Sequence, residues 1–191
     1  MDFRELDRQA VRTAGEVIAL VRPDHLHLPT PCVDWTLHGL LRHLVSEDLA
    51  FAAATTAGTD PSDVDWNAGR LGPDPVADHR RAAAAYVTAF EPDLVLGREM
   101  RIGVFGVLPG SVAVSMHLID TVVHGWDVAR TIGVPYAPDE HLVATALKVL
   151  RKFPAGRPTP AFDVQVDVPA DATELDKLVA YVGRDPGWVR P

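Results

Sequence analysis

The stretch SVAVSMHLIDTVVHGWDVARTI, residues 111–132, decides the fold of this 191-residue chain. It is the longest run with helical periodicity, and Gly133 followed by Pro135 provides a stop signal at its carboxyl end. Most of its positions are apolar, as in a helix at the interior of a bundle. The polar residues that it nevertheless carries are therefore the first place to look for function.

Further helices are predicted on both sides of this central segment. Apolar residues recur at helical spacing in each of them, Thr36 and Asp74 are suitable N-caps, and Gly183 ends the last one. The predicted ranges are residues 6–21, 37–52, 75–90, 138–153 and 173–182. This count favours an all-α bundle of four principal helices with short extra helices.

Two segments depart from the helical pattern. Residues 93–109 contain three glycines between short apolar runs, which predicts an irregular segment or a weak strand pair. Residues 162–168 alternate apolar and polar side chains, so we predict one short strand, a minor element near the C-terminus.

Composition limits the classes of protein to consider. A hydrophobic content of 47% suffices for one sizeable core, and we expect a single domain over residues 1–191. The net charge of −8 and the pI near 5.4 argue against nucleic acid as a partner. No apolar run reaches the ~20 residues of a membrane span, and the charged N-terminus is unlike a signal peptide. We therefore expect a cytoplasmic protein.

The central segment places four polar residues on one helical face: His117, Asp120, His124 and Asp127. Asp120 and His124, four residues apart, can converge on one ion, while His117 and Asp127 are equally placed on spacing alone. His43 can supply a third ligand from a facing helix, as in bundle metal sites. Three ligands of the type His, His and carboxylate leave a position for water or substrate, which is typical of a catalytic site.

Several other residues could lie next to such a site. Glu47 and Asp127 are expected to orient an imidazole or to act as a general base. Cys32, Trp35, Trp126 and Trp188 are interpreted as packing residues. A single histidine is usually solvated surface, and this reading is preferred for His25, His27, His38, His79 and His141.

Three motifs carry a family resemblance: TPCVDWTLHGLLRHLV (30–45), HLIDTVVHGWDVARTIG (117–133) and GRDPGW (183–188). Together they resemble the mycothiol-dependent maleylpyruvate isomerase N-terminal family, particularly its short actinobacterial members. The resemblance implies a DinB-like four-helix bundle that binds a divalent metal, zinc or nickel, through His43, Asp120 and His124. Related proteins carry Glu or His where this chain has Asp120.

The resemblance also implies a function. We expect a metal-dependent enzyme that uses a mycothiol-like, low-molecular-weight thiol as cosubstrate, of the S-transferase or isomerase type. Its partners would be that thiol and an electrophilic substrate, and a homodimer is left open. The alternative is a non-catalytic metal-binding bundle with a structural or interaction role.

Overall fold

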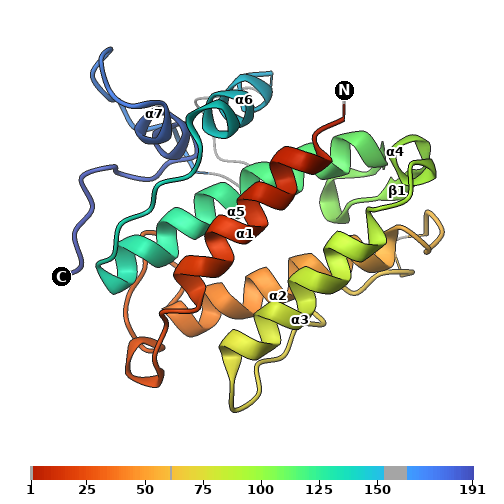
Figure 1. Ribbon diagram of the computed structural model, residues 1–191, viewed down its shortest axis with the longest axis horizontal. Helices are drawn as coiled ribbons and strands as arrows, with labels where there is room; N and C mark the ends of the chain where they lie inside the picture. Colours follow the sequence, from red (N-terminus) through yellow and green to blue (C-terminus); the bar gives the residue numbers. More distant parts are fainter. Residues whose placement is uncertain (1, 61, 153–162) are drawn as a thin grey trace.

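Four long helices form the body of the molecule in the computed structural model, which describes residues 2–60, 62–152 and 163–191 (Figure 1). α1 packs along α5, α2 packs along α3, and α2 also contacts α5. Of the α5 residues, 17 are buried, which agrees with its predicted place inside the bundle. The four are α1 (Arg4–Ile18), α2 (Leu37–Ala54), α3 (Pro75–Ala89) and α5 (Gly110–Ile132).

The ends of these helices lie close to the predicted positions. The hydroxyl of Thr36 accepts a hydrogen bond from the backbone N–H of Gly39, and the carboxylate of Asp74 accepts one from Ala77. Gly133 has a φ of +72°, the left-handed conformation that terminates α5.

Short elements complete the fold. β1 (Glu99–Arg101) and β2 (Val107–Pro109) form an antiparallel pair in which Met100 pairs with Leu108. Of the two alternatives predicted for residues 93–109, an irregular segment or a weak strand pair, the strand pair is observed. The remaining elements are η1 (Pro23–His25), α4 (Leu94–Gly97), η2 (Gly103–Phe105), α6 (Glu140–Leu150) and α7 (Glu174–Tyr181).

The two helices near the C-terminus pack on the bundle through apolar side chains. Leu118 and Val122 of α5 form one cluster with Leu142 of α6, Leu178 of α7 and Ala10 of α1. α6 and α7 also contact each other (Figure 1). The C-terminal part of the chain therefore shares its core with α1 and α5.

The prediction of a strand at residues 162–168 is wrong for residues 163–168, the part that the structure describes. Residues 163–169 form no strand, although the N–H of Val166 donates to the carbonyl of Ala180. Alternation favours an extended chain, but a strand also requires a neighbouring strand edge, and α7 lies there instead. Phe162 and Phe153, which belong to the predicted strand and helix, lie outside the described residues.

No helix in the described ranges combines the length and the hydropathy needed to cross a bilayer.

Candidate metal centre

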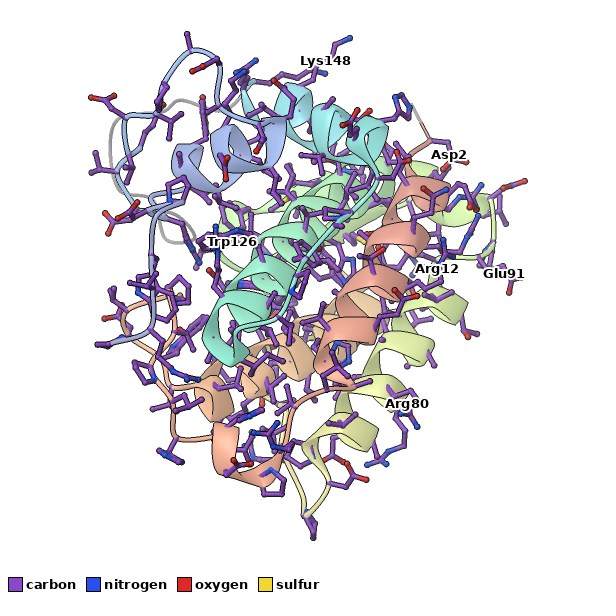
Figure 2. The ribbon with its side chains drawn as sticks, turned by 60° about the vertical axis from the view of Figure 1, so that its left-hand side comes forward. Asp2, Arg12, Arg80, Glu91, Trp126 and Lys148 are labelled. Atoms are coloured by element: carbon purple, nitrogen blue, oxygen red, sulfur yellow. The ribbon has the colours of Figure 1, made fainter. Side chains whose placement is uncertain are left out.

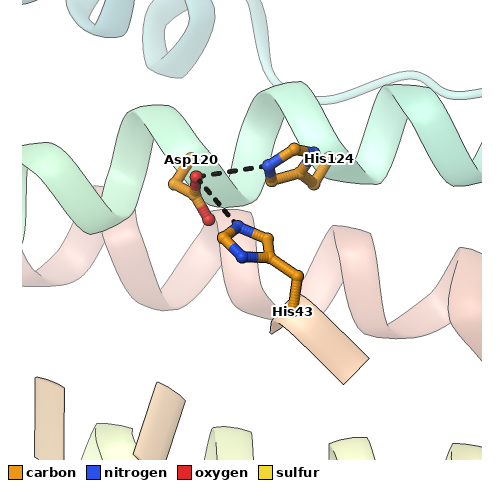
Figure 3. Close-up of side chains that lie close together, drawn as sticks. All are labelled: His43, Asp120 and His124. Atoms are coloured by element: carbon orange, nitrogen blue, oxygen red, sulfur yellow. Dashed lines mark ion pairs between the residues drawn. The ribbon is translucent and has the colours of Figure 1, made fainter. Parts of the chain in front are cut away.

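α2 and α5 bring His43, Asp120 and His124 together (Figure 3). The distance from Asp120 Oδ1 to His124 Nε2 is 3.3 Å, and that to His43 Nε2 is 3.7 Å. One potential ligand atom from each residue lies within 4.8 Å of the other two. Two residues one helical turn apart and one residue on a facing helix thus form a single cluster.

The geometry of this cluster fits a divalent cation. Ligand atoms about 2.1 Å from a tetrahedral ion stand about 3.4 Å from each other, close to the two distances from Asp120 Oδ1. Two imidazole nitrogens and one carboxylate oxygen suit zinc, and imidazole also suits nickel. The side chains of His43 and Asp120 are 22% and 23% exposed, so one side of the cluster faces solvent. A further ligand could enter from that side.

His124 and Asp120 stabilise each other's charged forms. Burial alone lowers the pKa of His124, but Asp120, and then Asp127, outweigh it and raise the pKa to about 9. Burial alone raises the pKa of Asp120. The charge and hydrogen bond of His124 outweigh burial and hold the pKa of Asp120 well below its usual range. In the absence of a cation these two residues therefore form an ion pair.

Glu47 lies beside this cluster, one turn after His43 on α2. Its Oε1 is 3.9 Å from His43 Nδ1, and its side chain is 21% exposed. Burial, followed by the negative charge of Asp120, raises the pKa of Glu47 to about 8. Both causes favour the protonated form of the Glu47 carboxyl group.

Asp127 contacts the opposite edge of the His124 ring. Its Oδ2 is 2.8 Å from His124 Nδ1, and the side chain is completely buried. Arg184 Nη2 lies 3.2 Å from the same carboxylate oxygen, whereas the guanidinium of Arg130 lies over the ring of Trp126. Arg184 belongs to the GRDPGW motif, yet no spacing rule connects it with a residue 57 positions earlier.

His117 is not part of this cluster, although the helical spacing places it on a similar face. Its ring is enclosed between Asp7 and Asp48, with both nitrogen–oxygen distances 2.9 Å, and stacks on Tyr86 with ring centroids 3.5 Å apart. The hydroxyl of Tyr86 donates to the other oxygen of Asp7 at 2.5 Å. This second polar group joins α1, α2, α3 and α5 in the interior of the bundle.

Two histidines interpreted as surface residues are buried. His25 Nδ1 accepts from the backbone N–H of Arg22, which closes the short turn of η1. His79 is 7% exposed, and its Nε2 lies 4.0 Å from Asp48. Each has a nearby polar group that the sequence alone does not reveal, while His27, His38 and His141 are exposed as expected.

Two tryptophans take different positions. The ring of Trp35 lies 4.5 Å from that of His43 and 6.0 Å from that of His124, so it forms a wall of the cluster rather than only packing. Trp126 lies on the flank of α5 next to α7, as expected for a packing residue (Figure 2). Cys32 is partly buried, and burial raises the pKa of its thiol to about 11.

The long helices form a bundle of the DinB-like fold, and the His, Asp, His cluster lies between two of them. The chain belongs to the mycothiol maleylpyruvate isomerase N-terminal domain family, whose sequence profile matches residues 7–129. The resemblance seen in the sequence motifs is thereby confirmed.

The chain is also similar to two proteins and two solved structures. Two uncharacterized proteins of Mycobacterium tuberculosis, MT0763 and Rv0738, are each 28% identical over 188 residues, covering 96% of this chain and 98% of theirs. The crystal structure of the mycothiol-dependent maleylpyruvate isomerase matches with a TM-score of 0.62 and 15% identity. A histidine-to-alanine mutant of that enzyme gives 0.60 and 14%, and each match covers 80% of this chain and 72% of the other. At this identity the likeness shows the fold.

Proposed function

We propose that this protein is a metal-dependent enzyme that uses a mycothiol-like thiol as cosubstrate in an S-transferase or isomerase reaction. The observation that carries the proposal is the convergence of His43, Asp120 and His124, open to solvent on one side. Membership in a family named for a mycothiol-dependent isomerase supports the choice of thiol. The second substrate would be a small electrophile.

The charge of the proposed ligand set favours an anionic cosubstrate. His43, Asp120 and His124 would hold a zinc or nickel ion, which stabilises a thiolate, the nucleophilic form of a thiol, at neutral pH. Two neutral imidazoles and one carboxylate offset only one charge of a divalent cation. The site then retains a positive charge that attracts a thiolate.

The neighbouring residues have separate roles in this proposal. Asp127 accepts a hydrogen bond from His124 Nδ1, so Nε2, which faces Asp120, is the nitrogen that would bind the ion after losing its proton. Glu47 acts as the acid or base, because its carboxyl group lies next to His43 and is partly exposed. Trp35 lies against both imidazoles and limits access of water from its side.

Mycothiol titrated into the zinc-loaded protein tests the proposal by calorimetry, after elemental analysis has shown the metal content. We expect about one zinc per chain and saturable thiol binding, and we expect both to be lost in His124→Ala. His141→Ala is the matched control, because that histidine is exposed on α6. It should bind zinc and thiol like the wild type.

Two outcomes would contradict the proposal in different ways. Stoichiometric zinc without thiol binding would favour the alternative, a non-catalytic bundle in which the ion only ties α2 to α5. A metal content far below one per chain after incubation with zinc or nickel would count against both readings.

A further inference from the structure

The carboxylate of Asp127 is completely buried and contacts two side chains, those of His124 and Arg184. Its Oδ2 lies 2.8 Å from His124 Nδ1 and 3.2 Å from Arg184 Nη2. Its Oδ1 is buried and has no hydrogen-bond partner in the part of the chain that the structure describes. A buried carboxylate is costly unless a countercharge compensates it. Arg184, itself only 6% exposed, provides that charge.

The backbone conformation at the end of α7 places Arg184 next to Asp127. Gly183 adopts a φ of +87°, and the N–H of Arg184 then donates to the carbonyl of Val179. A side chain at position 183 would be strained, and its Cβ would lie 2.6 Å from the Cβ of Asp163. Arg184 Nη1 also donates to the carbonyl of Val182, which further fixes the guanidinium.

The rest of the C-terminal segment is held against the end of α5. Arg130 Nη2 donates to the carbonyl of Pro186 at 2.8 Å, and Arg190 Nη1 donates to the carbonyl of Thr131 at 3.0 Å. Neither of these guanidiniums has a contact with Asp127 among the described residues. Three arginines therefore hold the C-terminal segment against α5. One of them, Arg184, contacts the carboxylate of Asp127, which in turn contacts His124.

We propose that Arg184 is a positioning residue of the metal centre: it holds Asp127 against His124 Nδ1, so that Nε2 stays directed at Asp120. This inference rests on the proposed function, since it assumes that the cluster binds a metal ion. Arg184 itself lies outside residues 7–129, the part of the chain that matches the family. The guanidinium also offsets the charge of Asp127. The carboxylate can therefore orient the imidazole without cancelling the positive charge of the loaded site.

Zinc affinity tests this role without an activity assay. Arg184→Met removes the charge and keeps most of the side-chain volume, and Arg190→Met is the matched control from the same segment. Mutation of a residue that orients a metal-binding histidine lowers metal affinity by roughly 10- to 100-fold. We expect a loss of this size for Arg184→Met. Arg190→Met should stay within about twofold of the wild type, since the hydrogen bond of Arg190 goes to the backbone carbonyl of Thr131 and not to Asp127.

Cobalt substitution gives a spectroscopic readout of the same effect. We expect the visible absorption of the cobalt-loaded protein to change in Arg184→Met, because the imidazole of His124 would sit differently. Arg190→Met should give the wild-type spectrum. A general loosening of the C-terminal segment would alter both variants alike.

A further variant covers the case in which Arg184→Met does not fold because Asp127 is left uncompensated. Asp127→Asn combined with Arg184→Met removes both buried charges, and this folded double variant should still bind zinc weakly. Wild-type zinc affinity and cobalt spectrum in either folded variant would overturn the inference, as would equal losses in Arg190→Met. Failure of the proposed function looks different, because the wild-type protein itself would then bind no zinc. Failure of the role of Arg184 alone would leave zinc binding to the wild type intact.

Discussion

His124 uses its two ring nitrogens for different purposes. Nδ1 lies 2.8 Å from Asp127 inside the protein, and Nε2 lies 3.3 Å from Asp120 at the cluster that is open to solvent. The buried contact fixes the ring, and the other nitrogen remains for a cation. Replacing either carboxylate should therefore affect metal binding, but for different reasons: Asp120 as a proposed ligand and Asp127 through the orientation of the ring.

Cys32 should react slowly with thiol reagents. Burial raises the pKa of its thiol to about 11, so little thiolate is present at pH 8. We expect the native protein to react with a disulfide reagent roughly a hundredfold more slowly than an unstructured cysteine peptide with a pKa near 8.5. Stopped-flow absorbance at pH 8 measures both rates, and the protein unfolded in guanidinium is the control. A native rate equal to that of the peptide would make Cys32 a candidate nucleophile.

Spacing within one helix was sufficient to find some of these residues and not others. Asp120 and His124 were found because α5 places them one turn apart, although their role as ligands stays a prediction. The same periodicity could not show that His117 meets Asp7 and Asp48, since it gives the face of a helix and not what covers that face. Arg184 was missed because its contact depends on how the C-terminal segment packs.

At the scale of elements, a single imidazole connects four helices. His117 of α5 bonds to Asp7 of α1 and Asp48 of α2, and it stacks on Tyr86 of α3. The ring is 2% exposed, so water cannot replace any of these contacts. Helix periodicity and N-caps predicted the helices themselves, but this junction depends on the way in which they pack.

The stability of the bundle should fall as the pH rises above neutrality. Burial alone lowers the pKa of His117, but Asp7 and Asp48 raise it to about 10, above the value near 6.5 of an unfolded chain. The stabilisation is therefore complete below about pH 6.5 and is lost as the pH rises through about 10. From His117 alone we expect a loss on the order of 3 kcal/mol between pH 7 and pH 10, measured as the difference in urea unfolding between the wild type and a variant without this imidazole.

His117→Gln provides the comparison for this pH dependence. It should be less stable at pH 7, by about 3 kcal/mol, because two buried carboxylates lose their cation. Its stability should also depend less steeply on pH than that of the wild type. Equal free energies of unfolding at pH 7 and pH 10 for the wild type would show that His117 carries no charge in the folded state.

Two glycines in long helices should respond in opposite ways to alanine. A Cβ would have no atom within 4 Å at either Gly15, inside α1, or Gly133, at the end of α5. Gly15→Ala should stabilise the protein by about 0.5–1 kcal/mol through helix propensity. Gly133→Ala should destabilise it by about 1 kcal/mol, because its φ of +72° strains any residue with a Cβ. Chemical unfolding measures both, and changes of the same sign would contradict this account.

At the scale of the whole molecule, we propose that residues 1–191 form one domain. Leu142 of α6 and Leu178 of α7 share a core with Ala10 and Leu118 of the bundle, although the family match ends at residue 129. We therefore expect one cooperative thermal transition, coincident by far- and near-ultraviolet circular dichroism. Two separate transitions would show that the C-terminal part unfolds independently.

Zinc should raise the temperature of this transition. An ion that binds the folded state alone at a free concentration of 100 times its Kd stabilises that state by about 2.7 kcal/mol. The same addition should leave the transition of His124→Ala unchanged. An equal shift for that variant would place the binding of zinc elsewhere on the molecule.

The position of Trp35 has a practical consequence. Its indole lies against both His43 and His124, and an imidazolium is an efficient quencher of indole emission. Displacement of a proton by zinc, which has a filled d shell and does not quench indole, should therefore brighten this tryptophan, so the protein carries its own optical reporter of zinc. Phenylalanine in place of the other three indoles would leave a single emitter whose intensity follows occupancy in real time, without a label. The three are Trp66, Trp126 and Trp188.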